Sequence, residues 1–191
     1  MQSFELNREE RLWLLALARK ELATCTGGPI PDIGEPPSAI VDTPCGAFVT
    51  LHKSGRLRGC IGTFRNDLPL HKVVAQMARA AAAHDSRFKP VVAAETGLID
   101  IEISVLTPME PLVNVEELVV GTHGLYVTMK GATGVLLPQV ATEWGMNKEQ
   151  FLEAVCEKAG LPPYAWKTGA SLFTFQALVF GEKDEKPFQD S

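Results

Sequence analysis

Apolar residues recur at two spacings along the chain, and each spacing predicts a different kind of element. A period near 3.6 over residues 7–22 and again over 70–84 predicts two amphipathic helices. The first helix begins with Asn7 and Glu10 in the arrangement of a capping box. Strict alternation over residues 99–105, with isoleucine or valine at every second position, predicts a strand with one buried face.

Two pairs of strand-like runs flank short segments that contain glycine, and each pair predicts a β-hairpin. The pairs are 45–51 with 57–64, and 125–129 with 133–138. A further helix is predicted at 147–159, where Asn147 and Gln150 form a second capping box, and a last strand is predicted at 172–179.

The order of these elements does not follow the regular strand–helix alternation of a doubly wound fold. It favours an α+β fold built on a mainly antiparallel sheet with flanking helices. The length of 191 residues is that of one ordinary domain. We therefore expect a single domain over residues 1–182, with a long loop rich in proline and glycine at 27–38 and a mobile charged tail at 183–191.

Composition narrows the classes of partner and cofactor. With 18 Lys and Arg against 23 Asp and Glu, the net charge of −5 disfavours nucleic-acid binding. No apolar run approaches the roughly 20 residues of a membrane span, and no secretory signal is visible, so we expect a soluble, cytoplasmic protein. Four cysteines without a C-x-x-C motif and four scattered histidines predict no metal site and no disulfide. No nucleotide or iron–sulfur motif is present, which leaves the cofactor unknown.

The most unusual string is GRLRGCIGT, which contains Cys60. In an extended chain, period-two alternation places Arg56, Arg58 and Cys60 on one face. A guanidinium beside a thiol raises the fraction of thiolate, the form that attacks electrophiles. The flanking Gly59 and Gly62 predict a bulge, or a close approach by a ligand or another backbone. The alternative is that Cys60 is a packing residue, as most lone cysteines are.

The part LRGCIG of this string resembles the hallmark of the AMMECR1 domain family. Later strings fit the same family in the same order: DSRFKP at 85–90, IEISVL at 101–106, GVLLPQVA at 134–141 and KAGL at 158–161. The resemblance implies an α+β fold with a larger and a smaller subdomain, separated by a cleft near the cysteine motif. It also implies two partners, a Memo-like protein related to extradiol dioxygenases and a radical S-adenosylmethionine protein. It does not carry a settled reaction.

Further residues are candidates for the same site. Glu102 is a carboxylate within a predicted strand and is a candidate base or partner of Arg58, although a solvated or salt-bridged strand face is the more common explanation of such a residue. His84, at a predicted helix end, is a candidate proton relay or simply a cap. The candidates for binding substrate are Arg56, Gly59, Gly62, Arg87 and Gln139.

Together these residues favour a redox or radical enzyme, or a component of one, centred on Cys60. Arg58 would tune the thiolate, and Glu102 or His84 would handle protons. The redox or radical class follows from the family resemblance alone, which also allows that a residue here is modified by the radical S-adenosylmethionine partner. The rival hypothesis is a non-catalytic module that binds partners. A third is a small-anion site formed by basic residues around Arg56.

Overall fold

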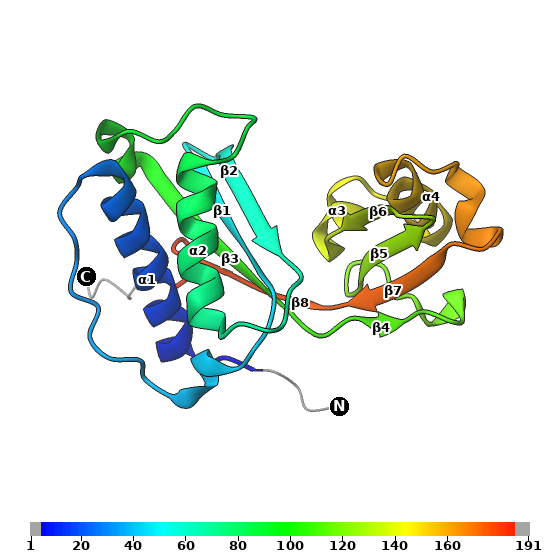
Figure 1. The fold of residues 1–191 in the computed structure, drawn as a ribbon, viewed down its shortest axis with the longest axis horizontal. Helices are drawn as coiled ribbons and strands as arrows, with labels where there is room; N and C mark the ends of the chain where they lie inside the picture. Colours follow the sequence, from blue (N-terminus) through cyan, green and yellow to red (C-terminus); the bar gives the residue numbers. More distant parts are fainter. Residues whose placement is uncertain (1–4, 186–191) are drawn as a thin grey trace. The chain divides into compact units, whose positions relative to one another are not determined.

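A computed structural model describes residues 5–185, which form two compact units (Figure 1). Unit 1 consists of the described residues up to Leu106 together with those from Leu178, and unit 2 is Thr107–Ala177. Each unit contains a four-stranded antiparallel sheet, so the predicted α+β class is confirmed. Among residues 5–185, no helix combines the length and apolar character that a membrane span requires.

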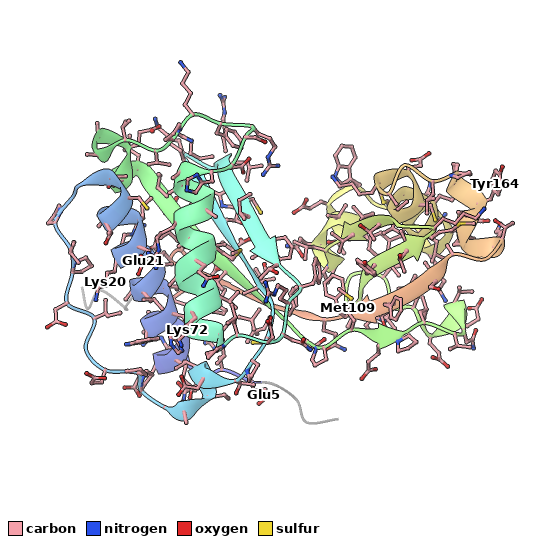
Figure 2. All side chains as sticks on the ribbon, viewed as in Figure 1. Glu5, Lys20, Glu21, Lys72, Met109 and Tyr164 are labelled. Atoms are coloured by element: carbon pink, nitrogen blue, oxygen red, sulfur yellow. The ribbon has the colours of Figure 1, made fainter. Side chains whose placement is uncertain are left out.

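Unit 1 is a sheet with two helices packed on one face. Its strands lie in the order β2-β1-β3-β8. The elements are α1 (Arg8–Thr26), β1 (Ala47–Lys53), β2 (Arg56–Thr63), α2 (Leu70–Ala83), β3 (Ile99–Leu106) and β8 (Ala177–Gly181), with short 3-10 helices η1 (Ala39–Asp42) and η2 (Ala93–Leu98). Figure 2 labels Glu21 on α1. This residue pairs with Arg79 on α2 at 2.9 Å, which ties the two helices together.

The helix-covered face of this sheet carries the core of unit 1. Alternate residues of β1 and β3 are buried against α1 and α2; they include Val49, Leu51, Ile101 and Ile103 on the strands and Leu14, Leu22, Val73 and Val74 on the helices. The predicted capping box of the first helix is present, with Asn7 and Glu10 exchanging hydrogen bonds. The predictions for both helices, the first hairpin and the alternating strand are thus confirmed.

Unit 2 repeats this plan with one main helix. Its strands lie in the order β4-β7-β5-β6. The elements are β4 (Glu110–Pro111), η3 (Val115–Glu117), β5 (Gly124–Met129), β6 (Ala132–Leu136), α3 (Pro138–Glu143), α4 (Lys148–Lys158), η4 (Pro163–Lys167) and β7 (Ser171–Phe175). Phe151, Leu152 and Val155 of α4 pack with Leu125 and Val127 of β5 in its core.

Two predicted elements were wrong in detail. The last strand is not continuous, because the backbone N–H and C=O of Gln176 bond to Thr107 instead of extending a ladder. Its halves, β7 and β8, belong to different sheets. The second hairpin ends at Leu136, since Pro138 opens helix α3, where its fixed φ and missing N–H are tolerated. Gln139 therefore lies in a helix and not at a strand end.

The end of the chain was predicted as a mobile tail from residue 183. Residues 186–191 of that segment lie outside the described residues. Residues 183–185 are described. Glu185 is buried and pairs with Arg11, and Lys183 pairs with Asp100 at 3.0 Å. The folded part of unit 1 thus extends at least to Glu185, further than the charged composition suggests. The single domain over 1–182 stays a prediction.

Candidate functional site

The cysteine motif lies on β2, the edge strand of the unit 1 sheet. Strand pairing sets Thr50 opposite Cys60, but His52 opposite Leu57, so Arg58 is the additional residue of a β-bulge. A bulge interrupts the alternation of side chains. The expectation that Arg56 and Arg58 share a face with Cys60 is therefore wrong for Arg56, which pairs with Lys53 and lies on the opposite face, whereas Arg58 is the bulged residue itself.

Both glycines of the motif are explained by contacts within the protein. A Cβ atom at Gly59 would lie 2.3 Å from the carbonyl oxygen of Ala81, so the backbone of α2 packs directly on this strand. A Cβ atom at Gly62 would lie 2.2 Å from Cγ of Phe48. The predicted bulge and close approach are both present, and the neighbours are a helix backbone and an aromatic ring.

Cys60 belongs to a row of polar side chains that crosses three strands. Thr50 on β1 faces both Cys60 on β2 and Glu102 on β3. The Thr50 hydroxyl donates a hydrogen bond to the Cys60 sulfur, with 3.2 Å between Oγ1 and Sγ. All three residues are half-buried on the sheet face opposite to α1 and α2, which we call the thiol face.

His52 also lies on the thiol face, two residues along β1 from Thr50. It is half-buried, and sequence reasoning placed it only in the hairpin turn. The signal that would have found it is the alternation of β1 itself: Val49 and Leu51 point into the core, so Thr50 and His52 point the other way.

Arg58 is paired with a carboxylate in the described chain. Its guanidinium donates to Glu95, with 2.9 Å between Nη2 and Oε2, and to the carbonyl oxygen of Lys89 at 2.9 Å. Lys53 also pairs with Glu95, at 2.7 Å. These hydrogen bonds, that from Arg58 first, lower the pKa of Glu95 to about 2. Within residues 5–185 no hydrogen bond or ion pair joins Arg58 to Cys60, and Arg58 and Lys53 share the single carboxylate of Glu95.

Asp85 and Arg87 hold the main chain of Cys60 instead. The Asp85 carboxylate accepts a hydrogen bond from the Cys60 N–H at 2.8 Å, and Arg87 Nη2 donates to the Cys60 carbonyl at 3.1 Å. The two side chains also pair with each other, Nη2 to Oδ2 at 2.7 Å. Asp85 is buried, and the Arg87 hydrogen bond holds its pKa well below the usual range. Sequence reasoning named Arg87 but missed Asp85.

The remaining candidates make no hydrogen bond to this row within the described residues. His84 ends α2, is exposed, and has no side-chain hydrogen bond or ion pair within the described part of the chain. Arg56 is exposed at the start of β2. Gln139 is a half-buried residue of α3 in unit 2. The structure thus groups Cys60 with Glu102 and Arg87, and it does not bring His84 or Arg56 into a hydrogen bond with them.

The four thiols are all free, and their surroundings differ. Burial raises the pKa of Cys45 to about 11, and burial is also the main cause that raises the pKa of Cys156. Cys25 is exposed on α1, whereas Cys60 is partly exposed and accepts a hydrogen bond from a hydroxyl. In the described chain, no three residues of the His, Cys, Asp and Glu types are grouped to hold a metal ion.

These features define an α+β protein of two sheet-containing units, with a half-buried thiol on the polar face of one sheet. The model of the AMMECR1 family matches residues 15–180, and the chain belongs to that family.

Relatives and a solved structure agree with this placement. The chain is 48% identical over 145 residues to a protein of Methanothermobacter thermautotrophicus, covering 72% of this chain and 75% of that one. It is 38% identical over 177 residues to a protein of Methanosarcina acetivorans, covering 88% and 89%. The crystal structure of the uncharacterized protein PH0010 from Pyrococcus horikoshii is similar with a TM-score of 0.82, 34% identity and 96% of each chain covered. The names of these proteins state no activity.

Proposed function

We propose that the chain is an enzyme, or a component of one, whose reactive group is the thiol of Cys60. The observation that carries this proposal is the hydrogen bond from the Thr50 hydroxyl to the Cys60 sulfur on a partly exposed face. A hydroxyl that donates to sulfur favours the thiolate, because hydrogen bonds to an ionised acceptor are the stronger ones. Cys45 and Cys156 are buried, and neither is available to an external reactant.

The other polar groups of the thiol face support proton transfer. Glu102 stands one strand beyond Thr50, so its Cβ lies about 10 Å from that of Cys60 on the spacing of paired strands. At that distance a carboxylate reaches the sulfur only through an intervening group, and the Thr50 hydroxyl occupies that position. Strand register places the imidazole of His52 on the thiol face, so His52 joins His84 as a candidate for handling protons.

The redox or radical class of the reaction and its partners rest on the family. We propose that the chain acts in the cytoplasm on a small-molecule substrate, together with a Memo-like protein and a radical S-adenosylmethionine protein. The radical partner would either share that substrate or modify a residue of this chain. Arg56 and Gln139 remain candidates for contacts with the substrate, and His84 remains a candidate for handling protons.

A non-catalytic binding module is the second candidate function. The observation that favours it is that contacts within the protein account for two features of the cysteine motif, the arginine and the glycines. Arg58 is paired with Glu95, and the glycines accommodate α2 and Phe48. In such a module Cys60 would be one more residue of the packed sheet.

Reconstitution of the full chain with its two partners separates these functions. Cys60→Ser is compared with Cys25→Ser, which changes an exposed thiol on α1. For each variant, the affinity for both partners and the turnover of S-adenosylmethionine in the complete mixture are measured. The proposal predicts that Cys60→Ser keeps its affinities and loses turnover at least a hundredfold, while Cys25→Ser keeps both. Full turnover with Cys60→Ser would establish the binding module instead.

A further inference from the structure

One continuous segment, residues 81–95, follows the edge of β2 at the cysteine motif, and we call it the edge segment. It touches three consecutive residues of the strand. The carbonyl of Ala81 packs on Gly59, and Glu95 binds Arg58 with its carboxylate. Asp85 and Arg87 bind Cys60.

The contacts at Cys60 take the place of a missing strand. Because Cys60 and Thr50 face each other with close side chains, the N–H and C=O of Cys60 point away from β1. At a sheet edge these two groups would face solvent or another chain. Here the Asp85 carboxylate replaces the carbonyl of a neighbouring strand, and the Arg87 guanidinium replaces its N–H.

A restraint is needed at this point of the strand more than elsewhere. Cys60 directly follows Gly59, and Gly62 lies two residues further along the strand. The bulge at Arg58 precedes both glycines. Glycine and bulges both loosen an edge strand. Two charge-assisted hydrogen bonds on the main chain of Cys60 fix the direction in which its Cα–Cβ bond leaves the sheet, which keeps the side chain in reach of Thr50.

We propose that Asp85 and Arg87 are positioning residues of the Cys60 site, which fix the cysteine main chain and set the balance of charge around the thiol. The inference deepens the proposed function and rests on it, since positioning matters for reactivity only if the thiol reacts. Asp85 has 3% of its side chain exposed and Arg87 has 54%, so the carboxylate is buried and the guanidinium reaches solvent. We call these two residues the clamp, which holds one negative and one positive charge.

This pair of opposite charges provides a test that a purely structural role does not satisfy. The charged and titratable groups around Cys60 are Asp85 and Arg87 from the edge segment, Glu102 from β3 and His52 from β1. Removing the charge of Asp85 leaves Arg87 to favour the thiolate, whereas removing Arg87 leaves the negative charge of Asp85 to oppose it. A loss of structure would change thiol reactivity in the same direction in both variants.

The experiment uses the full chain with Asp85→Asn and Arg87→Met. Asp67→Asn and Arg65→Met serve as matched controls, because Arg65 and Asp67 form a similar pair two residues apart that makes no hydrogen bond to Cys60 in the described chain. Two quantities are measured: the pH midpoint of Cys60 alkylation by a neutral reagent, followed by mass spectrometry, and the exchange rate of the Cys60 amide. Arg87→Lys tests rescue by a conserved charge.

The proposal predicts that the pH midpoint falls by about half a unit in Asp85→Asn and rises by a similar amount in Arg87→Met. Amide exchange at Cys60 should rise about tenfold in Asp85→Asn, because Asp85 accepts the hydrogen bond from this amide, and by a smaller factor in Arg87→Met, which removes the ion pair that holds Asp85. Exchange in Arg87→Lys should rise less than in Arg87→Met, and the controls should not change. Midpoints that move together, or an exchange rate equal to that of the controls, would overturn the proposal. Faster exchange in a protein whose Cys60 is inert would support the clamp and contradict the proposed function. If Asp85→Asn does not fold, the two Arg87 variants decide.

Discussion

The two units are built on the same plan, and the residues at equivalent positions of their sheets can be compared. Gly59 in unit 1 and Gly134 in unit 2 each lie on an edge strand, where a helix backbone packs against them. A Cβ atom would lie 2.3 Å from Ala81 O in the first case and 2.7 Å from Val155 O in the second. Close packing of helix on strand therefore accounts for a glycine in both places.

The next row of residues is where the units differ. In unit 1, Cys60, Thr50 and Glu102 face one another across three strands. The equivalent row of unit 2 is Val135, Tyr126 and Phe173, and the two aromatic rings pack edge to face with 6.0 Å between their centroids. In both units the glycine is therefore required for packing of the helix on the strand. The side chains that differ in chemical character lie in the next row, on the opposite face of the sheet.

The largest expected effect comes from filling the space at these glycines. Gly59→Ala should lower the free energy of unfolding by about 3 kcal/mol and Gly134→Ala by about 2 kcal/mol, because an added Cβ meets backbone that must move. Gly97→Ala is the control, since nothing lies within 4 Å of its Cβ position, and it should change stability by less than about 0.5 kcal/mol. Denaturant unfolding measures all three. Equal stabilities for Gly59→Ala and Gly97→Ala would show that α2 does not pack on β2 as described.

A smaller effect should distinguish the units in acid. Arg58, and after it Lys53, lower the pKa of Glu95 from 4.5 to about 2, so its ionised form stabilises the folded state of unit 1. That stabilisation is present above pH 4.5 and is lost as the pH falls toward 2. The protection of β2 amides against exchange, taken relative to the intrinsic rate at each pH, should therefore fall over this range more than the protection of β5 amides.

Glu95→Gln is the variant that isolates this effect. It should remove about 1 kcal/mol of stability at pH 7, since the ion pairs are partly exposed, and it should flatten the acid dependence of unit 1. Its effect on unit 2 should be smaller than on unit 1. An unchanged acid profile in β2 would show that another group controls the acid response of this unit.

Much of the fold of unit 1 could be predicted from local pattern. The structure contains the helix that begins after Asn7, the hairpin formed by β1 and β2, and the alternating strand β3. Each of these elements depends on residues close in sequence. The strand alternation that identified Glu102 also explains why it lies in line with Cys60 once the strands are paired.

The parts that were missed depend on single residues or on distant contacts. Arg58 is the additional residue of the bulge that the glycines predict, but a period-two pattern does not show that this residue moves Arg56 off the face of Cys60. Asp85 reaches Cys60 across 25 positions of the chain, which no local spacing indicates. The split between β7 and β8 depends on hydrogen bonds from Gln176 to Thr107, 69 positions away.

Site-resolved alkylation of the folded chain at pH 7 tests most directly whether Cys60 is a reactive thiol activated by Thr50. Cys25, which is exposed, provides the reference within the same molecule. In the unsubstituted chain, Cys60 should react faster than Cys25. Thr50→Val should slow the alkylation of Cys60 about fivefold, because it removes one hydrogen bond, whereas Thr50→Ser should not slow it. A Cys60 that reacts only after unfolding, at the same rate in all three proteins, would contradict this prediction.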